Sequence, residues 1–212
     1  MLEEGLPEVS LKELFLFSMK VRSAILLAVI AEALVAIYGI IQFGLSVEGL
    51  QATTRFSGRL SLVLFSFIFL LHPRKKETLQ QLLSTNYFLV FAVAHGIHLM
   101  ELLSYVMLSG IPLVPIRLAG GFIAYLMIFL MPWFQMRFEQ KKITEIRMQQ
   151  LGFVYLFYVW FIFFMTYLSR VNGSFPNAGG SHTEHVVLMG WVCVMLGVKL
   201  GETLFTKSTT SN

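Results

Sequence analysis

Six long apolar stretches constrain the fold of this chain more than any other feature of its sequence. They cover residues 23–43, 58–71, 87–109, 116–134, 151–168 and 185–205. As a helix, each is long enough or nearly so to cross about 30 Å of hydrocarbon. The second is short, so its helix should begin before Arg59, and Pro132 should mark the end of the fourth. We therefore expect an all-α, polytopic membrane protein built as a bundle of six transmembrane helices.

The composition agrees with a protein that lies in the lipid bilayer. Of 212 residues, 56% are hydrophobic and 13% are charged, whereas a soluble domain is about one quarter charged. The single cysteine, Cys193, excludes an intrachain disulfide and a cysteine metal cluster. A net charge of +4 could suggest nucleic acid, but the basic residues lie in short connections between apolar stretches. We expect a lipid bilayer, and no nucleic acid, as the partner.

The distribution of lysine and arginine predicts the orientation and the domain boundaries. Eleven basic residues fall on one side, at positions 12, 20, 22, 74, 75, 76, 137, 141, 142, 147 and 207. Four fall on the other, at positions 55, 59, 117 and 170. The positive-inside rule then places both termini in the cytoplasm. We expect a cytoplasmic tail with an interfacial helix over 1–22, a transmembrane domain over 23–205 and a cytoplasmic tail over 206–212.

The third stretch carries ionisable side chains at a depth in the bilayer where a charged group is energetically costly. His95, His98 and Glu101 follow one another at intervals of three, so they share one face of a helix. A neutral imidazole can ligate haem iron, which makes His95 and His98 candidate metal ligands. Alternatively, the three side chains pair with polar groups of neighbouring helices, and Glu101 could then meet Arg59 or Arg117. The residues alone leave both interpretations open.

Two histidines on one helical face cannot bind opposite sides of one iron, so a second helix must complete a haem site. The fifth stretch contains no histidine, although Gln149 stands at its start. Glu32 in the first stretch is a further ionisable residue within an apolar run. Together with His95, His98 and Glu101 it could form part of a proton or ion path, so a small transporter is a third alternative.

Two further pairs of polar residues lie near or within the sixth stretch. His182 and His185 are three residues apart and are interpreted as a solvated helix start, with a metal site as the alternative. Lys199 and Glu202 have the same spacing and are expected to form a local ion pair.

Three segments resemble the ferric reductase-like transmembrane domain superfamily, which includes six-span bacterial haem b proteins. They read RFSGRLSLVLFSFIFLLHP, NYFLVFAVAHGIHLMELLSYV and LGFVYLFYVWFIFFMTYLSR. The resemblance covers about residues 53–170, and its best motif combines His95 and His98 with Arg55, Gly58 and Arg59. It implies haem b as a cofactor, with His95 and His98 as candidate axial ligands from this helix and Arg55 or Arg59 beside the haem propionates.

The chain departs from the superfamily pattern in its fifth stretch. The superfamily typically has a Leu-His pair shortly before a glycine there, and often a deeper histidine. Here Gln149 stands three residues before Gly152, and Ile162 falls near the deeper position. Either haem is bound through His95 or His98 with Gln149, water or no group opposite, or haem has been lost and the fold remains as a scaffold.

These observations leave two main functional classes. The first is a non-catalytic accessory or assembly subunit of a larger membrane complex, with other membrane-protein subunits as partners. The second is a haem b electron-transfer membrane protein that uses His95 and His98. In either case the resemblance implies the inner membrane of a bacterium.

Overall fold

The computed structural model describes residues 11–83, 86–110, 115–174 and 179–209, and side chains over 22–23, 25–83, 86–110, 119–174 and 179–202. These residues form seven helices and no strand. The helices are α1 (Leu11–Phe43), α2 (Val47–Leu71), α3 (Lys76–Leu82), α4 (Tyr87–Ser109), α5 (Pro115–Glu139), α6 (Glu145–Val171) and α7 (His182–Thr209). All except α3 are long and apolar enough to cross a membrane. The expected six-helix membrane bundle is confirmed.

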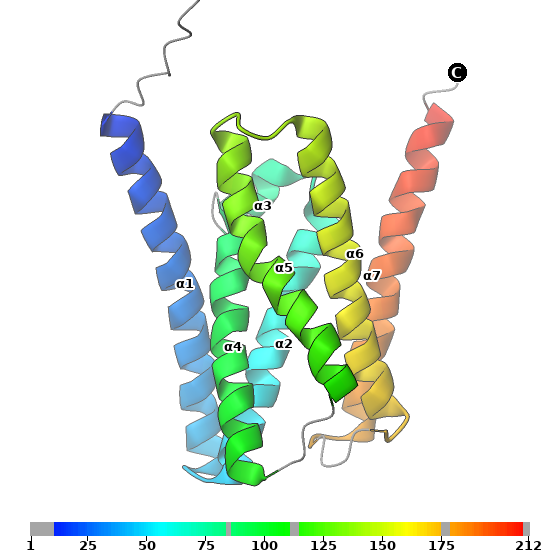
Figure 1. The fold of residues 1–212 in the computed structure, drawn as a ribbon. Helices are drawn as coiled ribbons and strands as arrows, with labels where there is room; N and C mark the ends of the chain where they lie inside the picture. The colour runs from blue at the N-terminus through cyan, green and yellow to red at the C-terminus, as the bar shows by residue number, and fades with distance from the viewer. Residues whose placement is uncertain (1–10, 84–85, 111–114, 175–178, 210–212) are drawn as a thin grey trace, which may run out of the picture.

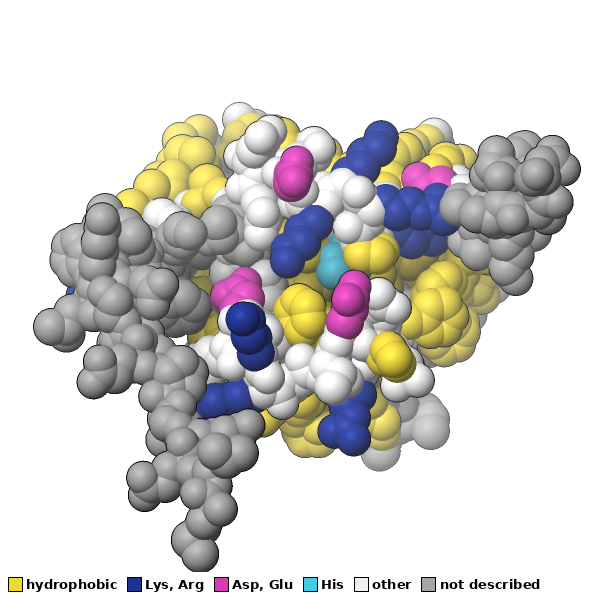
Figure 2. All heavy atoms as spheres, turned by 90° about the horizontal axis from the view of Figure 1, so that it is seen from above, with side chains coloured by type: hydrophobic (Ala, Val, Ile, Leu, Met, Phe, Trp, Pro, Cys, Tyr) yellow, Lys and Arg dark blue, Asp and Glu magenta, His cyan; other side chains and the backbone are white. Residues whose placement is uncertain are grey.

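The six long helices lie roughly side by side, with α1 and α7 on opposite flanks (Figure 1). The start of α1, the short α3, the α5–α6 connection and the end of α7 lie together, and we call this the basic end. Viewed onto that end, lysine and arginine side chains are spread between apolar ones (Figure 2). The start of α2 and the α6–α7 connection lie at the opposite end of the bundle.

The helix bounds differ from the sequence predictions in three places. Over the described residues 11–22 the chain is part of α1, which runs without a break from Leu11 to Phe43, and the rest of the segment predicted over 1–22 lies outside the described residues. The helix of the fourth span does not end at Pro132 but continues to Glu139, since neighbouring helices let membrane spans tolerate proline. The short α3, which is too short to cross a membrane, was not predicted. The prediction that the second helix begins before Arg59 is confirmed, because Ser46 caps α2 with a 3.1 Å bond from the Gly49 amide.

The core of the bundle surrounds α2, which packs against α1, α4, α6 and α7. Phe65 of α2 is fully buried, and its ring lies 5.7 Å from Phe91 of α4 and 5.3 Å from Phe163 of α6. Lipid tails are as apolar as these rings, so close packing rather than exclusion of water holds such helices together.

Side chains join α7 to both ends of α2. At the opposite end, Arg59 pairs with Glu184. At the basic end, the Lys199 ammonium donates to the His72 carbonyl at 2.5 Å, and Arg74 lies 3.5 Å from Glu202. The spacing of Lys199 and Glu202 predicted a local pair, but both residues also reach across to the segment that follows α2.

Candidate functional site on the inner face of α4

The candidate site lies on one polar face of α4, a helix that is capped at both ends. The Asn86 side chain caps its start by accepting a 3.2 Å bond from the Leu89 amide, and Gly110 ends it with a positive φ of 66°. Within these limits His95, His98 and Glu101 follow at intervals of three residues. The apolar residues before them, including Phe91, are part of the core. The face that carries the histidines therefore points into the bundle.

His95 is surrounded by aromatic rings. Its imidazole stacks on Tyr125 of α5 at 4.9 Å and on Phe91 at 5.2 Å, with Phe163 of α6 at 6.0 Å. The Nδ1 atom is buried and has no hydrogen-bond partner among the described residues. Burial of a polar atom without a partner costs about 1–3 kcal/mol. The surroundings of His95 are therefore aromatic, and its Nδ1 atom makes no hydrogen bond to them.

His98 lies directly beside His95 and against α2. The two imidazole centroids are 5.2 Å apart. A Cβ atom added to Gly58 would lie 3.1 Å from the Cε1 atom of His98, so the glycine makes room for the ring. The Nδ1 atom of His98 is also buried without a hydrogen-bond partner in the described part of the chain. Gly58, which the sequence linked only to the family motif, has a specific steric role here.

Two carboxylates occupy the same interior, where α1, α2 and α4 pack together. Glu32 of α1 is 2% exposed, and its carboxyl group lies within reach of the buried Ser57 hydroxyl of α2. Glu101 of α4 is an ionisable neighbour of Glu32, and the buried Ser57 of α2 lies next to both carboxyl groups. The expected pairing of Glu101 with Arg59 is wrong, because Arg59 pairs with Glu184. The side chain of Arg117 lies outside the described residues.

A group of arginines lies beyond the histidines, at the end of the bundle opposite the basic end. Arg55 and Arg59 come from α2 and Arg170 from α6, while Glu184 of α7 is the carboxylate among them. Arg170 is the charged neighbour of His98. The Nε atoms of Arg55 and Arg170 are buried without partners in the described region. The structure thus brings the two predicted arginines together and adds Arg170, which comes from a distant part of the chain.

Gln149 does not join this site. Its side chain is exposed and bonds Glu145 of the same helix at 3.3 Å. Phe163, which lies beside His95, comes about 21 Å further along α6 at 1.5 Å per residue. The structure therefore keeps Gln149 away from the histidines, because it places this residue near the start of α6, at the basic end.

A haem site with two axial histidines would need one imidazole from each of two helices, whereas His95 and His98 both come from α4. His95 or His98 could provide one axial nitrogen, and the arginines could bind carboxylates. A second axial histidine is not among the described neighbours, since His72 bonds the Tyr87 hydroxyl at 2.7 Å and His185 lies 3.0 Å from the Gly179 carbonyl. Within the described residues, no group of three or more histidine, cysteine or acidic side chains gathers around a metal position.

Two histidines outside this face are more buried than the sequence indicated. His185 is 4% exposed, so the interpretation as a solvated helix start is wrong for this residue. His72 follows α2 at the basic end, and its ring lies 3.3 Å from the place of a Cβ added to Gly152. Burial, together with Lys199 and Lys76, lowers the pKa of His72 to about 4. Gly152 and Tyr87 form its surroundings, which a single sequence does not reveal.

Comparison of the chain with protein-family models, curated proteins and solved structures found no match.

Proposed function

We propose that this protein is a non-catalytic accessory or assembly subunit of a larger membrane complex, built on a ferric reductase-like transmembrane bundle. In this proposal it lies in a bacterial inner membrane with both termini in the cytoplasm. The observation that carries the proposal is the packing of His95. Its ring stacks on Tyr125 and Phe91 of the chain itself. Gln149 lies near the start of α6, far from His95, and bonds Glu145.

The small share of described residues outside the membrane-spanning helices supports the same proposal. Nearly all described residues belong to the six long helices, and the described connections between them are short. The described residues therefore offer little surface outside the bilayer for binding a soluble substrate. Its exposed side chains along the helices are apolar, with Phe122, Trp133 and Phe153 among them. In a bilayer these side chains contact lipid or the helices of partner subunits.

The proposal is tested by isolating the tagged chain from its native membrane in a mild detergent. We expect one or more membrane proteins to co-purify in a fixed molar ratio, measured by quantitative mass spectrometry after crosslinking in intact membranes. A chain that purifies alone, carries haem and reduces an acceptor would contradict the proposal.

A second candidate is a haem b electron-transfer protein, and a specific observation favours it. The Nδ1 atoms of His95 and His98 are both buried without a partner among the described residues, and such groups call for a missing ligand or water. His95 or His98 would hold the iron, and Arg55, Arg59 and Arg170 would bind the propionates. The haem would supply one-electron transfer.

Absorption spectroscopy separates the two candidates. Under the haem proposal the purified protein shows a Soret band that His95→Ala or His98→Ala abolishes, while His182→Ala leaves it intact because His182 is exposed at the start of α7. A folded, colourless preparation, also after growth with added haem precursor, would contradict the haem proposal.

A further inference from the structure

A pocket of about 330 Å³ lies at the basic end, between the last turns of α5 and the first turns of α6. Its lining is divided into two kinds of side chain. The apolar part consists of Trp133, Phe134, Ile143 and Leu151, and the basic part of Arg137, Lys142 and Arg147. None of the lining residues is acidic. The pocket therefore combines an apolar wall with a surplus of positive charge.

The position of this pocket matches the border between hydrocarbon and water. The candidate spans of α5 and α6 end and begin at Glu139 and Glu145, immediately beside it. Trp133 is 44% exposed, and the Arg137 guanidinium lies over its ring at 4.9 Å. Tryptophan and arginine side chains at the ends of spans lie at the level of lipid headgroups.

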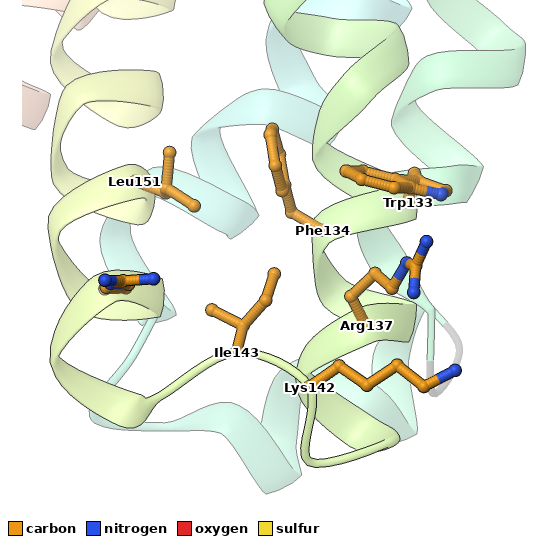
Figure 3. A pocket seen from close by; sticks show the side chains of 7 residues that line it. Trp133, Phe134, Arg137, Lys142, Ile143 and Leu151 are labelled. Carbon is orange, nitrogen blue, oxygen red and sulfur yellow. The ribbon is translucent and has the colours of Figure 1, made fainter.

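The close-up view separates the two parts of the pocket. Leu151 from α6 faces Phe134 from α5, with Ile143 of the connection beside them (Figure 3). Arg137 and Lys142 extend on the α5 side of this apolar wall. An acyl chain could pack on the wall while a phosphate group binds the two cations.

The backbone of the connection holds Lys142 next to Arg137. The Lys142 amide donates to the Arg137 carbonyl at 2.9 Å, and the Lys141 amide donates to the Phe138 carbonyl at 2.9 Å. Lys141 has a φ of 57°, in the left-handed region. This is the Schellman pattern that ends helices, and it turns the chain so that Lys142 returns to the last turn of α5.

We propose that this pocket binds an anionic phospholipid of the leaflet that meets the basic end. Arg137 and Lys142 bind its phosphate, Arg147 adds attraction from α6, and Phe134, Ile143 and Leu151 pack against its acyl chain. Arginine binds phosphate oxygens in a forked geometry and lysine adds a compact charge. Basic pockets between transmembrane helices are suited to such headgroups.

The test compares thermal unfolding of the purified full chain in mixed micelles that contain phosphatidylglycerol or phosphatidylcholine. A third sample contains phosphatidylcholine micelles with inorganic phosphate in the buffer. We expect phosphatidylglycerol to raise the midpoint by about 4 °C over phosphatidylcholine, and native mass spectrometry to detect at least one retained phosphatidylglycerol. The variant Lys142→Gln with Arg147→Gln should lose at least half of this shift.

The matched control is Arg22→Gln with Lys75→Gln, which removes the same charge from exposed positions outside the pocket. It should keep the full shift. Equal midpoints in the two lipids, equal stabilisation by inorganic phosphate, or an equal loss of the shift in the control would each overturn the proposal. If the pocket variant does not fold, the difference in midpoint between the two lipids and the lipid retained by the unmodified chain still test whether the protein binds phosphatidylglycerol.

Discussion

At the scale of single residues, Glu32 is a carboxylic acid buried inside the bundle. It is 2% exposed within a membrane-spanning helix, and its described polar neighbours are the Ser57 hydroxyl and the Glu101 carboxyl group. Glu32→Gln removes the ionisable group and keeps an amide of the same shape that can still bond the Ser57 hydroxyl. We expect the variant to be more stable by about 1–3 kcal/mol, measured as the midpoint of thermal unfolding in detergent.

The control for this prediction is Glu77→Gln, which changes an exposed carboxylate and should have little effect. A loss of stability on Glu32→Gln would contradict the prediction, and would indicate that the carboxylate binds a group that the described residues do not include.

His72 makes stability depend on pH in a defined direction. Its pKa is lowered from 6.5 to about 4 in the folded protein, so below about pH 6.5 the unfolded chain binds a proton that the folded protein does not bind until about pH 4. Stability should therefore fall as the pH decreases through this interval. Thermal unfolding measured between pH 7.5 and 4.5 should show this loss, and His72→Gln should reduce it.

His182→Gln is the matched control, since this histidine is exposed at the other end of the bundle. Its pH profile should follow that of the unmodified protein. Identical profiles for His72→Gln and the unmodified protein would contradict the assignment of the pH dependence to His72.

Sequence reasoning identified part of the interior polar face and could not identify its partners. Helical spacing places His95 and His98 on one side of a helix, and the depth of the span marks them as unusual. Ser57, Arg170 and Glu184 lie near this face or the arginines because distant helices pack together. Such contacts depend on tertiary packing, which spacing within one helix does not encode.

At the scale of helices and their connections, the end of α5 carries backbone strain. Lys141 adopts a φ of 57°, a conformation that costs a side-chain-bearing residue about 1–2 kcal/mol. Lys141→Gly should therefore stabilise the protein by about 0.5–1 kcal/mol, because glycine adopts this conformation without a steric cost. Gln140→Gly, one residue earlier, should instead destabilise it. The two midpoints of unfolding in detergent give the comparison, and the opposite order would contradict the strain argument.

Helix bounds were predictable where hydropathy alone decides them, and less so elsewhere. The six spans follow from runs of apolar residues, which a bilayer requires. The continuation of α5 through Pro132 depends on neighbouring helices, and the continuity of α1 across Arg22 depends on the absence of a breaking residue. The α3 helix is too short and too polar to give a periodic signal.

At the scale of the whole molecule, the orientation of the bundle is a prediction open to direct measurement. The native Cys193 is first replaced by serine, and single cysteines are introduced at exposed positions as Gln140→Cys and Asn172→Cys, which lie at opposite ends. With both termini in the cytoplasm, a membrane-impermeant maleimide should label Asn172→Cys in intact cells. Gln140→Cys should react only after the membrane is opened, and the reverse pattern would contradict the predicted orientation.

Contacts spread from Glu184 to Lys199 hold α7 to the rest of the bundle. This last helix is fastened to α2 by Arg59–Glu184, by the bond of Trp191 to Ser66 and by Lys199 on the His72 carbonyl, and it also packs along α6. These contacts do not need a covalent link between α6 and α7. A chain divided within the α6–α7 connection should therefore reassemble when its two pieces are produced in the same cell, and α7 would act as a docking part that can be supplied in trans.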